Sequence, residues 1–387
     1  MGERIIGSYY TGVPGRTFLG VGGLHGNEPA GGLALGRVLD TLREQSIPVH
    51  GRIVALSGHL EAQARNVRFI DEDLNRLWTP ERVARIVAGE IHTTEEREAR
   101  ELLAAFENVF DEAEDEVIFM DLHTTSADGE PFTFVGDTLR NRELARDFPV
   151  PVIFGLEEQL DGGLTEYLGN RGCRTIGFEG GQHDDPDAVE YNEAAIWIVL
   201  TSAGIVPRNR VPRYRELVKK LRGATAGKPP VLEVRYRYPI GVREQFEMLP
   251  GFRNFQRVKR DQLLARDHGA EVRAEETGRI LLPLYQALGT DGFFISRPFN
   301  AFWLSVSAML RKLHLDRWIV RFPGVGPEPD ANYVRVDPSV ARWYVIEIFH
   351  LLGFRKHRPR DGILILSRRK YDLKAPSRVE PLTGEIH

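Results

Sequence analysis

Four short runs of nearly uninterrupted apolar residues constrain the fold of this chain more than any other feature. They span Thr17–Gly22, Arg52–Ser57, Glu116–Leu122 and Arg174–Phe178. The segments between them carry apolar residues at helical spacing, as in the stretch that begins after Pro29. Strands without polar alternation are buried on both faces, and the helices between them cover those faces. The pattern predicts an α/β fold with a mostly parallel or mixed sheet flanked by helices.

The pattern changes near residue 222, which predicts three regions. Residues 1–222 are expected to form the α/β domain, and a short linker rich in Gly and Pro follows it. Short strands separated by turn residues then predict a small β-rich domain over 223–296. Residues 297–387, in which Lys and Arg outnumber Asp and Glu, are expected to form a basic α+β extension. Its helices are predicted near 300–313 and 340–352.

Composition limits the partners of the protein. The 387 residues carry a formal charge of -4 and one cysteine, Cys173. This balance argues against a dedicated nucleic-acid binder, and a single cysteine excludes an internal disulfide framework and a multi-cysteine zinc site. The longest apolar stretch, near 301–310, is shorter than the roughly 20 residues that span a bilayer. We therefore expect a cytoplasmic protein without a membrane span, and no contact of 299–313 with a membrane surface.

Two motifs at predicted strand ends have the composition of a metal site. His25-Gly-Asn-Glu28 lies where a strand gives way to a helix, and Asp121-Leu-His123 ends another strand. Two histidines and a glutamate form the ligand set of a catalytic zinc with its fourth position open. Asp121 is expected to point away from His123 if the strand continues, or else to orient a ligand. A hydrogen bond at the strand end is the alternative for Asp121.

Two further motifs supply groups for catalysis and substrate binding. Arg68, Asn75 and Arg76 lie within nine residues, and guanidinium groups can grip a carboxylate or polarise a carbonyl. The alternative is a solvated loop joined by Asp–Arg pairs. Glu179 follows a buried strand and precedes two glycines. A carboxylate in that position suits a general base, although a purely structural role is the alternative.

Together the motifs GGLHGNEPAG, RFIDEDLNRLW, DLHTT and GFEGGQ resemble, in order and spacing, the succinylglutamate desuccinylase/aspartoacylase family of the zinc carboxypeptidase-like superfamily. The resemblance covers roughly residues 15–295. It implies one zinc ion per chain, held by His25, Glu28 and His123. It also implies that Glu179 is the general base and that Arg68 polarises the scissile carbonyl.

The resemblance extends to the substrate pocket. It implies that Asn75 and Arg76 bind a substrate carboxylate and that Tyr167 and Arg171 match a substrate-binding Tyr-x-x-x-Arg pair. An ordinary pair on one helix face is the alternative for Tyr167 and Arg171. It further implies that the β-rich segment shapes the substrate channel. Aspartoacylase carries a substrate-binding tyrosine there, whereas this chain has Phe293 and Phe294 in the similar stretch. Acetylaspartate is therefore not singled out as the substrate.

These features predict a zinc-dependent hydrolase that cleaves the amide bond of an N-acyl amino acid or a similar small carboxylate by attack of zinc-activated water. One alternative is a carboxypeptidase that acts on short peptides. Another is an inactive metal-binding scaffold whose C-terminal region binds a partner. The family resemblance also makes a homodimer possible. The residues do not identify the acyl group or the amino acid.

Overall fold

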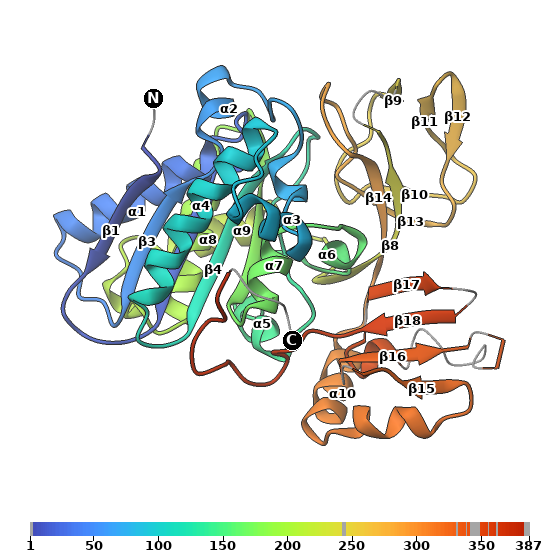
Figure 1. The fold of residues 1–387 in the computed structure, drawn as a ribbon. Helices are drawn as coiled ribbons and strands as arrows, with labels where there is room; N and C mark the ends of the chain where they lie inside the picture. The colour runs from blue at the N-terminus through green and yellow to red at the C-terminus, as the bar shows by residue number, and fades with distance from the viewer. Residues whose placement is uncertain are drawn as a thin grey trace.

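The protein is built around one large mixed β-sheet (Figure 1). The computed structural model describes residues 3–241, 245–329, 332–337, 339–340, 349–354, 356–360 and 363–382. Over these residues the sheet has eleven strands in the order β1-β3-β2-β4-β7-β5-β6-β8-β14-β13-β10. The prediction of a mixed sheet flanked by helices and followed by smaller β-structure is confirmed.

The first half of the sheet belongs to the α/β domain. Its central strands β3, β2, β4 and β7 are parallel neighbours, whereas β1 and β5 pair antiparallel at either side of them. The strands are β1 (Ile5–Tyr10), β2 (Thr17–Gly22), β3 (Arg52–Ser57), β4 (Val117–Thr125), β5 (Phe132–Phe134), β6 (Val152–Phe154) and β7 (Arg174–Gln182). Strands β4 and β7 run beyond their predicted ends and therefore include His123 and Glu179.

Helices cover both faces of this sheet, which explains its unbroken apolar runs. Phe18 of β2 packs with α1 and α8 on one face, and the next residue, Leu19, packs with α4 and α7 on the other. Successive side chains on a strand point to opposite faces, so both need apolar residues. The helices are α1 (Ala30–Glu44), α2 (Leu60–Arg65), α3 (Pro80–Val87), α4 (Thr94–Asp111), α5 (Leu139–Ala145), α6 (Leu156–Gln159), α7 (Leu164–Asn170), α8 (Ala188–Ser202) and α9 (Tyr214–Ala224).

The turn from β2 into α1 is tightly packed and carries two of the predicted metal ligands. A side chain at Gly22 would collide with the backbone of Gly31 and Gly32 in the first turn of α1. Glycine therefore lets strand and helix approach closely. The intervening loop, which contains His25 and Glu28, is held at the carboxyl end of the sheet, where open α/β sheets form their sites.

The β-rich region shares the main sheet with the α/β domain. Strand β8 (Val231–Pro239) pairs in parallel with β6, and β14 (Asp291–Pro298) pairs with β8. Backbone hydrogen bonding therefore runs across the boundary predicted near residue 222. The remaining strands are β10 (Arg257–Val258) and β13 (Gly278–Leu281) in the main sheet, and β9 (Phe246–Met248), β11 (Leu263–Asp267) and β12 (Ala270–Arg273) in a second sheet.

The C-terminal region has a helix, a third sheet and a returning segment. Helix α10 (Ala301–Lys312) confirms the helix predicted near 300–313, whereas the one predicted near 340–352 falls largely outside the described residues. The sheet strands are β15 (Val325–Pro327), β16 (Tyr333–Val336), β17 (Lys356–Arg360) and β18 (Ile363–Ser367). The chain then runs back along the α/β domain near α5 and α7 (Figure 1), where Leu382 enters the core beside α7.

Over the described residues, the helices are all too short or too polar to cross a bilayer.

Candidate active site

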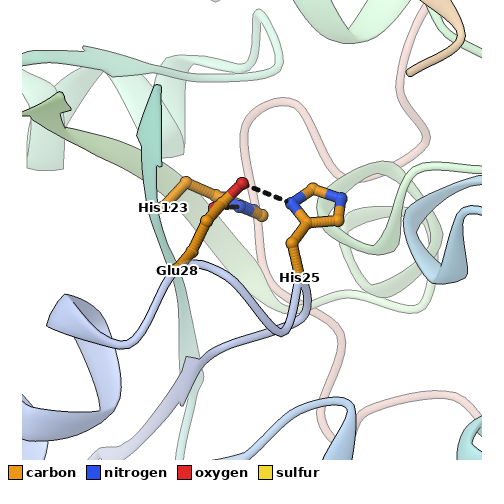
Figure 2. Close-up of side chains that lie close together, drawn as sticks. All are labelled: His25, Glu28 and His123. Carbon is orange, nitrogen blue, oxygen red and sulfur yellow. Dashed lines mark hydrogen bonds and ion pairs between the residues drawn. The ribbon is translucent and has the colours of Figure 1, made fainter. Parts of the chain in front are cut away.

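His25, Glu28 and His123 form a buried cluster whose ligand atoms all lie within 4.8 Å of one another. His25 comes from the loop after β2, Glu28 from the residues just before α1, and His123 from β4. The Nδ1 atoms of the two imidazoles lie 2.9 Å from the two carboxylate oxygens of Glu28 (Figure 2). His123, which is far from His25 and Glu28 in the sequence, thus converges with them, and the three residues could hold a metal ion.

Each imidazole has an aspartate on its other side. His25 Nε2 lies 3.1 Å from Oδ1 of Asp73, and His123 Nε2 lies 2.9 Å from Oδ2 of Asp121. These carboxylates turn Nδ1 of each ring toward Glu28. The expectation that Asp121 points away from His123 was wrong. Strand β4 continues past His123, and residues two apart on a strand share a face.

The arrangement of charges fits a bound cation. A neutral imidazole carries one proton and can donate to only one of the two carboxylates beside it. A divalent cation held by His25, Glu28 and His123 would remove this conflict. Burial raises the pKa of Glu28, but His25 and His123 outweigh that effect and hold it well below its usual range. The carboxylate is therefore ionised and able to bind a metal.

Glu179 lies beside His123 because β4 and β7 are in register there. The two residues are direct partners in the parallel pair. Glu179 is buried, and within the described structure its Oε2 has no hydrogen-bond partner. Burial raises the pKa of Glu179 well above its usual value, and the charge of Glu28 adds to this, although His123 opposes it. A carboxyl group with a raised pKa is suited to accept and return a proton.

Arg68 reaches the same cluster from the loop after α2. Its guanidinium donates to Glu28 Oε1 at 3.2 Å and to Asp73 Oδ2 at 3.0 Å. The predicted alternative, a loop joined by Asp–Arg pairs, describes the Arg68–Asp73 contact. The loop is not a solvated one, however, because Asp73 is buried and Arg68 lines the cavity over the cluster.

Sequence reasoning missed the group that holds this loop. Glu95, in the first turn of α4, accepts hydrogen bonds from the backbone N–H groups of Ile70, Asp71 and Glu72 at 2.7–3.3 Å. His59 Nε2 lies 2.8 Å from the same carboxylate, and both side chains are fully buried. The sequence signal for this group was the pair Glu95 and Glu96 in the first turn of α4, after the cap residue Thr93. Their charge suits a helix N-terminus, which makes them look like ordinary surface residues.

Asn75 and Arg76 also line the cavity, but both have partners in the protein. Asn75 Oδ1 accepts a hydrogen bond from the backbone N–H of Leu164 at 2.9 Å. Arg76 Nη2 donates to Asp291 Oδ2 at 2.8 Å. Asp291 also accepts a hydrogen bond from Arg237. Charge pairing therefore ties the loop after Arg68 to the β-rich region.

Tyr167 and Arg171 are not brought to the cavity. The Tyr167 hydroxyl donates to the carbonyl oxygen of Leu382 at 2.5 Å, and Arg171 donates to the carbonyl oxygen of Pro381 at 2.6 Å. Both side chains are buried beneath the end of the chain. The structure thus corrects the placement expected for this pair, because the C-terminal segment, which the resemblance did not cover, occupies their polar groups.

A cleft of about 890 Å³, its open mouth included, extends from the His25–Glu28–His123 cluster. The α/β domain forms one wall. The β-rich region supplies the other, in which Phe294 lies beside the cavity whereas Phe293 is buried elsewhere. Further lining residues are Thr124, Thr125, Ser126, Phe134, Leu156, Glu157, Leu160, Thr165, Glu166, Leu282, Leu284, Gln286, Gly289 and Thr290. The β-rich segment therefore does shape this cleft.

The mixed sheet, with the buried His–Glu–His cluster at the carboxyl ends of its central strands, defines an α/β protein with a candidate metal centre. Residues 14–184 match the profile of the succinylglutamate desuccinylase/aspartoacylase catalytic domain. This match confirms the resemblance that the motifs predicted, over residues 14–184. A search among curated proteins gave no match.

Solved structures share the fold. The succinylglutamate desuccinylase/aspartoacylase from Rhodobacter sphaeroides is 21% identical with a TM-score of 0.53, and the match covers 74% of this chain and 87% of that one. The product-bound ectoine utilization protein EutE from Ruegeria pomeroyi is 18% identical with a TM-score of 0.53 over 75% and 87% of the two chains. The succinylglutamate desuccinylase from Vibrio cholerae is 17% identical with a TM-score of 0.52 over 74% and 82%.

Proposed function

We propose that this protein is a zinc-dependent hydrolase that cleaves the amide bond of an N-acyl amino acid or a similar small carboxylate. The observation that carries the proposal is the convergence of His25, Glu28 and His123 with Glu179 at the end of one cleft. The match of residues 14–184 to the family profile supports it, as do the names of the fold relatives, which include succinylglutamate desuccinylases.

Zinc suits this donor set. Two imidazole nitrogens and one carboxylate are the ligands of many catalytic zinc sites, which leave a further position open. When bound, the ion would lower the pKa of a water molecule and polarise the substrate carbonyl. The aspartates Asp73 and Asp121 would keep the two imidazoles oriented, because each carboxylate lies within 3.1 Å of the nitrogen that faces away from Glu28.

Glu179 and Arg68 would act on the scissile amide, Glu179 in proton transfer and Arg68 in stabilising the oxyanion. Glu179 takes a proton from the attacking water and returns it to the leaving nitrogen, a role that its raised pKa favours. Arg68 donates hydrogen bonds to the oxygen that becomes negative during attack. Its guanidinium already lies beside Glu28, so little rearrangement is needed.

Asn75 and Arg76 would bind the carboxylate of the substrate. The side-chain oxygen of Asn75 accepts from the backbone of Leu164, which leaves its amide nitrogen to donate to a ligand. A substrate carboxylate would share Arg76 with Asp291. This competition would make carboxylate binding weaker than at an unpaired arginine.

The test is amine release from a panel of N-acyl amino acids and short peptides by zinc-loaded protein. A Glu179→Gln variant, with its zinc content measured, serves as the matched control. Hydrolysis of N-acyl amino acids that is lost in the variant and on zinc removal is expected. Hydrolysis of peptides alone would identify a carboxypeptidase instead. No hydrolysis at all, with zinc bound, would point to the inactive scaffold and overturn the proposal.

A further inference from the structure

The segment Arg369–Leu382, which we call the C-terminal strap, lies outside the matched residues 14–184 and yet packs on them. Asp372 accepts a hydrogen bond from the backbone N–H of Leu139 at 2.8 Å through its side chain. Arg140 in turn donates to the carbonyl oxygen of Tyr371. At its other end the strap buries Leu382 among apolar residues of α4 and α7. It is therefore an integral part of the α/β domain.

The first residue of the strap reaches the wall of the cleft. Arg369 forms a buried ion pair with Glu157, and Glu157 lines the cleft. Only 9% of Arg369 and 5% of Glu157 is exposed to solvent, so this pair is shielded far more than a surface ion pair. Glu158 lies 3.9 Å from the same guanidinium. One arginine of the strap thus faces two adjacent carboxylates of α6.

The surrounding backbone leaves room for this pair. A side chain at Gly136 would collide with both the Arg369 guanidinium and the Glu157 carboxylate. Gly155 has a φ of 83°, which turns the chain from β6 into α6 and brings Glu157 to the cleft. Thr165 also lines the cleft, and it lowers the pKa of Glu157. The hydrogen bond from Arg369 is therefore what holds the Glu157 carboxylate in place.

Electrostatics makes Glu157 dependent on Arg369. The pKa of Glu157 is raised to about 7, because burial and the charges of Glu158 and Glu166 outweigh the lowering by Arg369. Without the arginine, the carboxyl group would remain protonated to higher pH. A protonated carboxyl group donates a hydrogen bond, whereas an ionised one only accepts. The arginine thus favours the ionised form of Glu157, which accepts hydrogen bonds.

We propose that Arg369 is a positioning residue of the substrate site, which holds Glu157 in the cleft wall as the acceptor for a hydrogen-bond donor of the substrate. The donor is an N–H, ammonium or hydroxyl group outside the scissile amide. This inference rests on the proposed function, since it assumes that the cleft binds the substrate. Through Arg369, the C-terminal strap would then contribute to substrate specificity, although it is far in the sequence from the site motifs.

The kinetic test compares Arg369→Gln, Glu157→Gln and the double variant on the best substrate of the panel. The control is Arg378→Gln, at an exposed position of the same strap. Each single variant should raise KM about tenfold, the loss expected for one charged hydrogen bond, with kcat nearly unchanged. The double variant should resemble either single one, because both remove the same interaction. Unchanged KM in both single variants, or additive effects, would overturn the proposal.

A second measurement does not depend on activity. Hydrogen–deuterium exchange over residues 156–170 should become faster in Arg369→Gln and in Gly136→Ala, which displaces the pair from the opposite side. It should stay unchanged in Arg378→Gln and in Gly223→Ala, where a side chain meets nothing within 4 Å. If no substrate is hydrolysed, the proposed function fails, and the exchange measurement alone then tests whether Arg369 positions Glu157. Unchanged exchange in Arg369→Gln would then refute it.

Discussion

The two parts of the cleft are built in different ways. At the metal end, the charged groups stand on or beside neighbouring strands, so the sheet register alone brings His123 and Glu179 together. In the outer wall, the pairs Glu157–Arg369 and Arg76–Asp291 join residues 212 and 215 positions apart. The difference teaches that reaction chemistry can be encoded in local motifs, whereas the shape and charge of a substrate site depend on distant segments.

The largest effect should come from the metal end. Glu179→Gln removes the group that takes and returns the proton, so turnover should fall by about 10²–10⁴-fold. Zinc content should stay at the wild-type level, because Glu179 is not among the three clustered ligands. Single-turnover kinetics with parallel metal analysis measures both. Loss of zinc in the variant would show instead that Glu179 holds the site together.

The aspartates behind the imidazoles should matter next. Asp121→Asn removes the negative charge that lies 2.9 Å from His123 Nε2, so zinc affinity should fall by about 10–100-fold. Competition with a chelator of known affinity measures this. Asp115→Asn, at an exposed position before the same strand, is the control and should bind zinc like the wild type. Equal affinity in both variants would show that Asp121 does not orient the ligand.

The loop that carries Arg68 and Arg76 connects the two parts of the cleft, and Glu95 holds this loop. Glu95→Gln replaces a charged acceptor of three backbone N–H groups, so kcat/KM should fall roughly tenfold while zinc stays bound. Glu101→Gln on the exposed face of α4 is the matched control. Steady-state kinetics at several substrate concentrations separates KM from kcat. An unchanged kcat/KM, with the fold intact, would mean that the loop holds its shape without this carboxylate.

The smallest effect should appear in stability at acid pH. The pKa of Glu98 is lowered to about 2 although burial opposes this, because hydrogen bonds and ion pairing from His59 and Arg4 outweigh it. A lowered pKa stabilises the fold above the usual value of 4.5, and this contribution is lost as pH falls toward 2. Denaturation midpoints of Glu98→Gln should therefore depend less on pH over this window. The same slope in variant and wild type would contradict the prediction.

Much of the fold was predictable because its signals are local. The runs Thr17–Gly22 and Arg52–Ser57 are strands with those same bounds, since apolar periodicity reports burial on each face. The ends of β4 and β7 were placed too early, because polar residues such as His123 and Glu179 look like the start of a loop. A site residue inside a strand breaks the pattern by which the strand is recognised.

The sequence alone determined which segments become the central strands, the His25–Glu28 and His123 motifs, and the resemblance to the family. These depend on side chains and spacings within a few residues. Only the tertiary structure decided that Asp121 backs His123, that Glu95 holds the Arg68 loop, and that the strap takes Tyr167 and Arg171 away from the cleft. Buried polar groups choose partners by three-dimensional proximity, and a residue such as Arg369 carries no local mark of the carboxylate that it will meet.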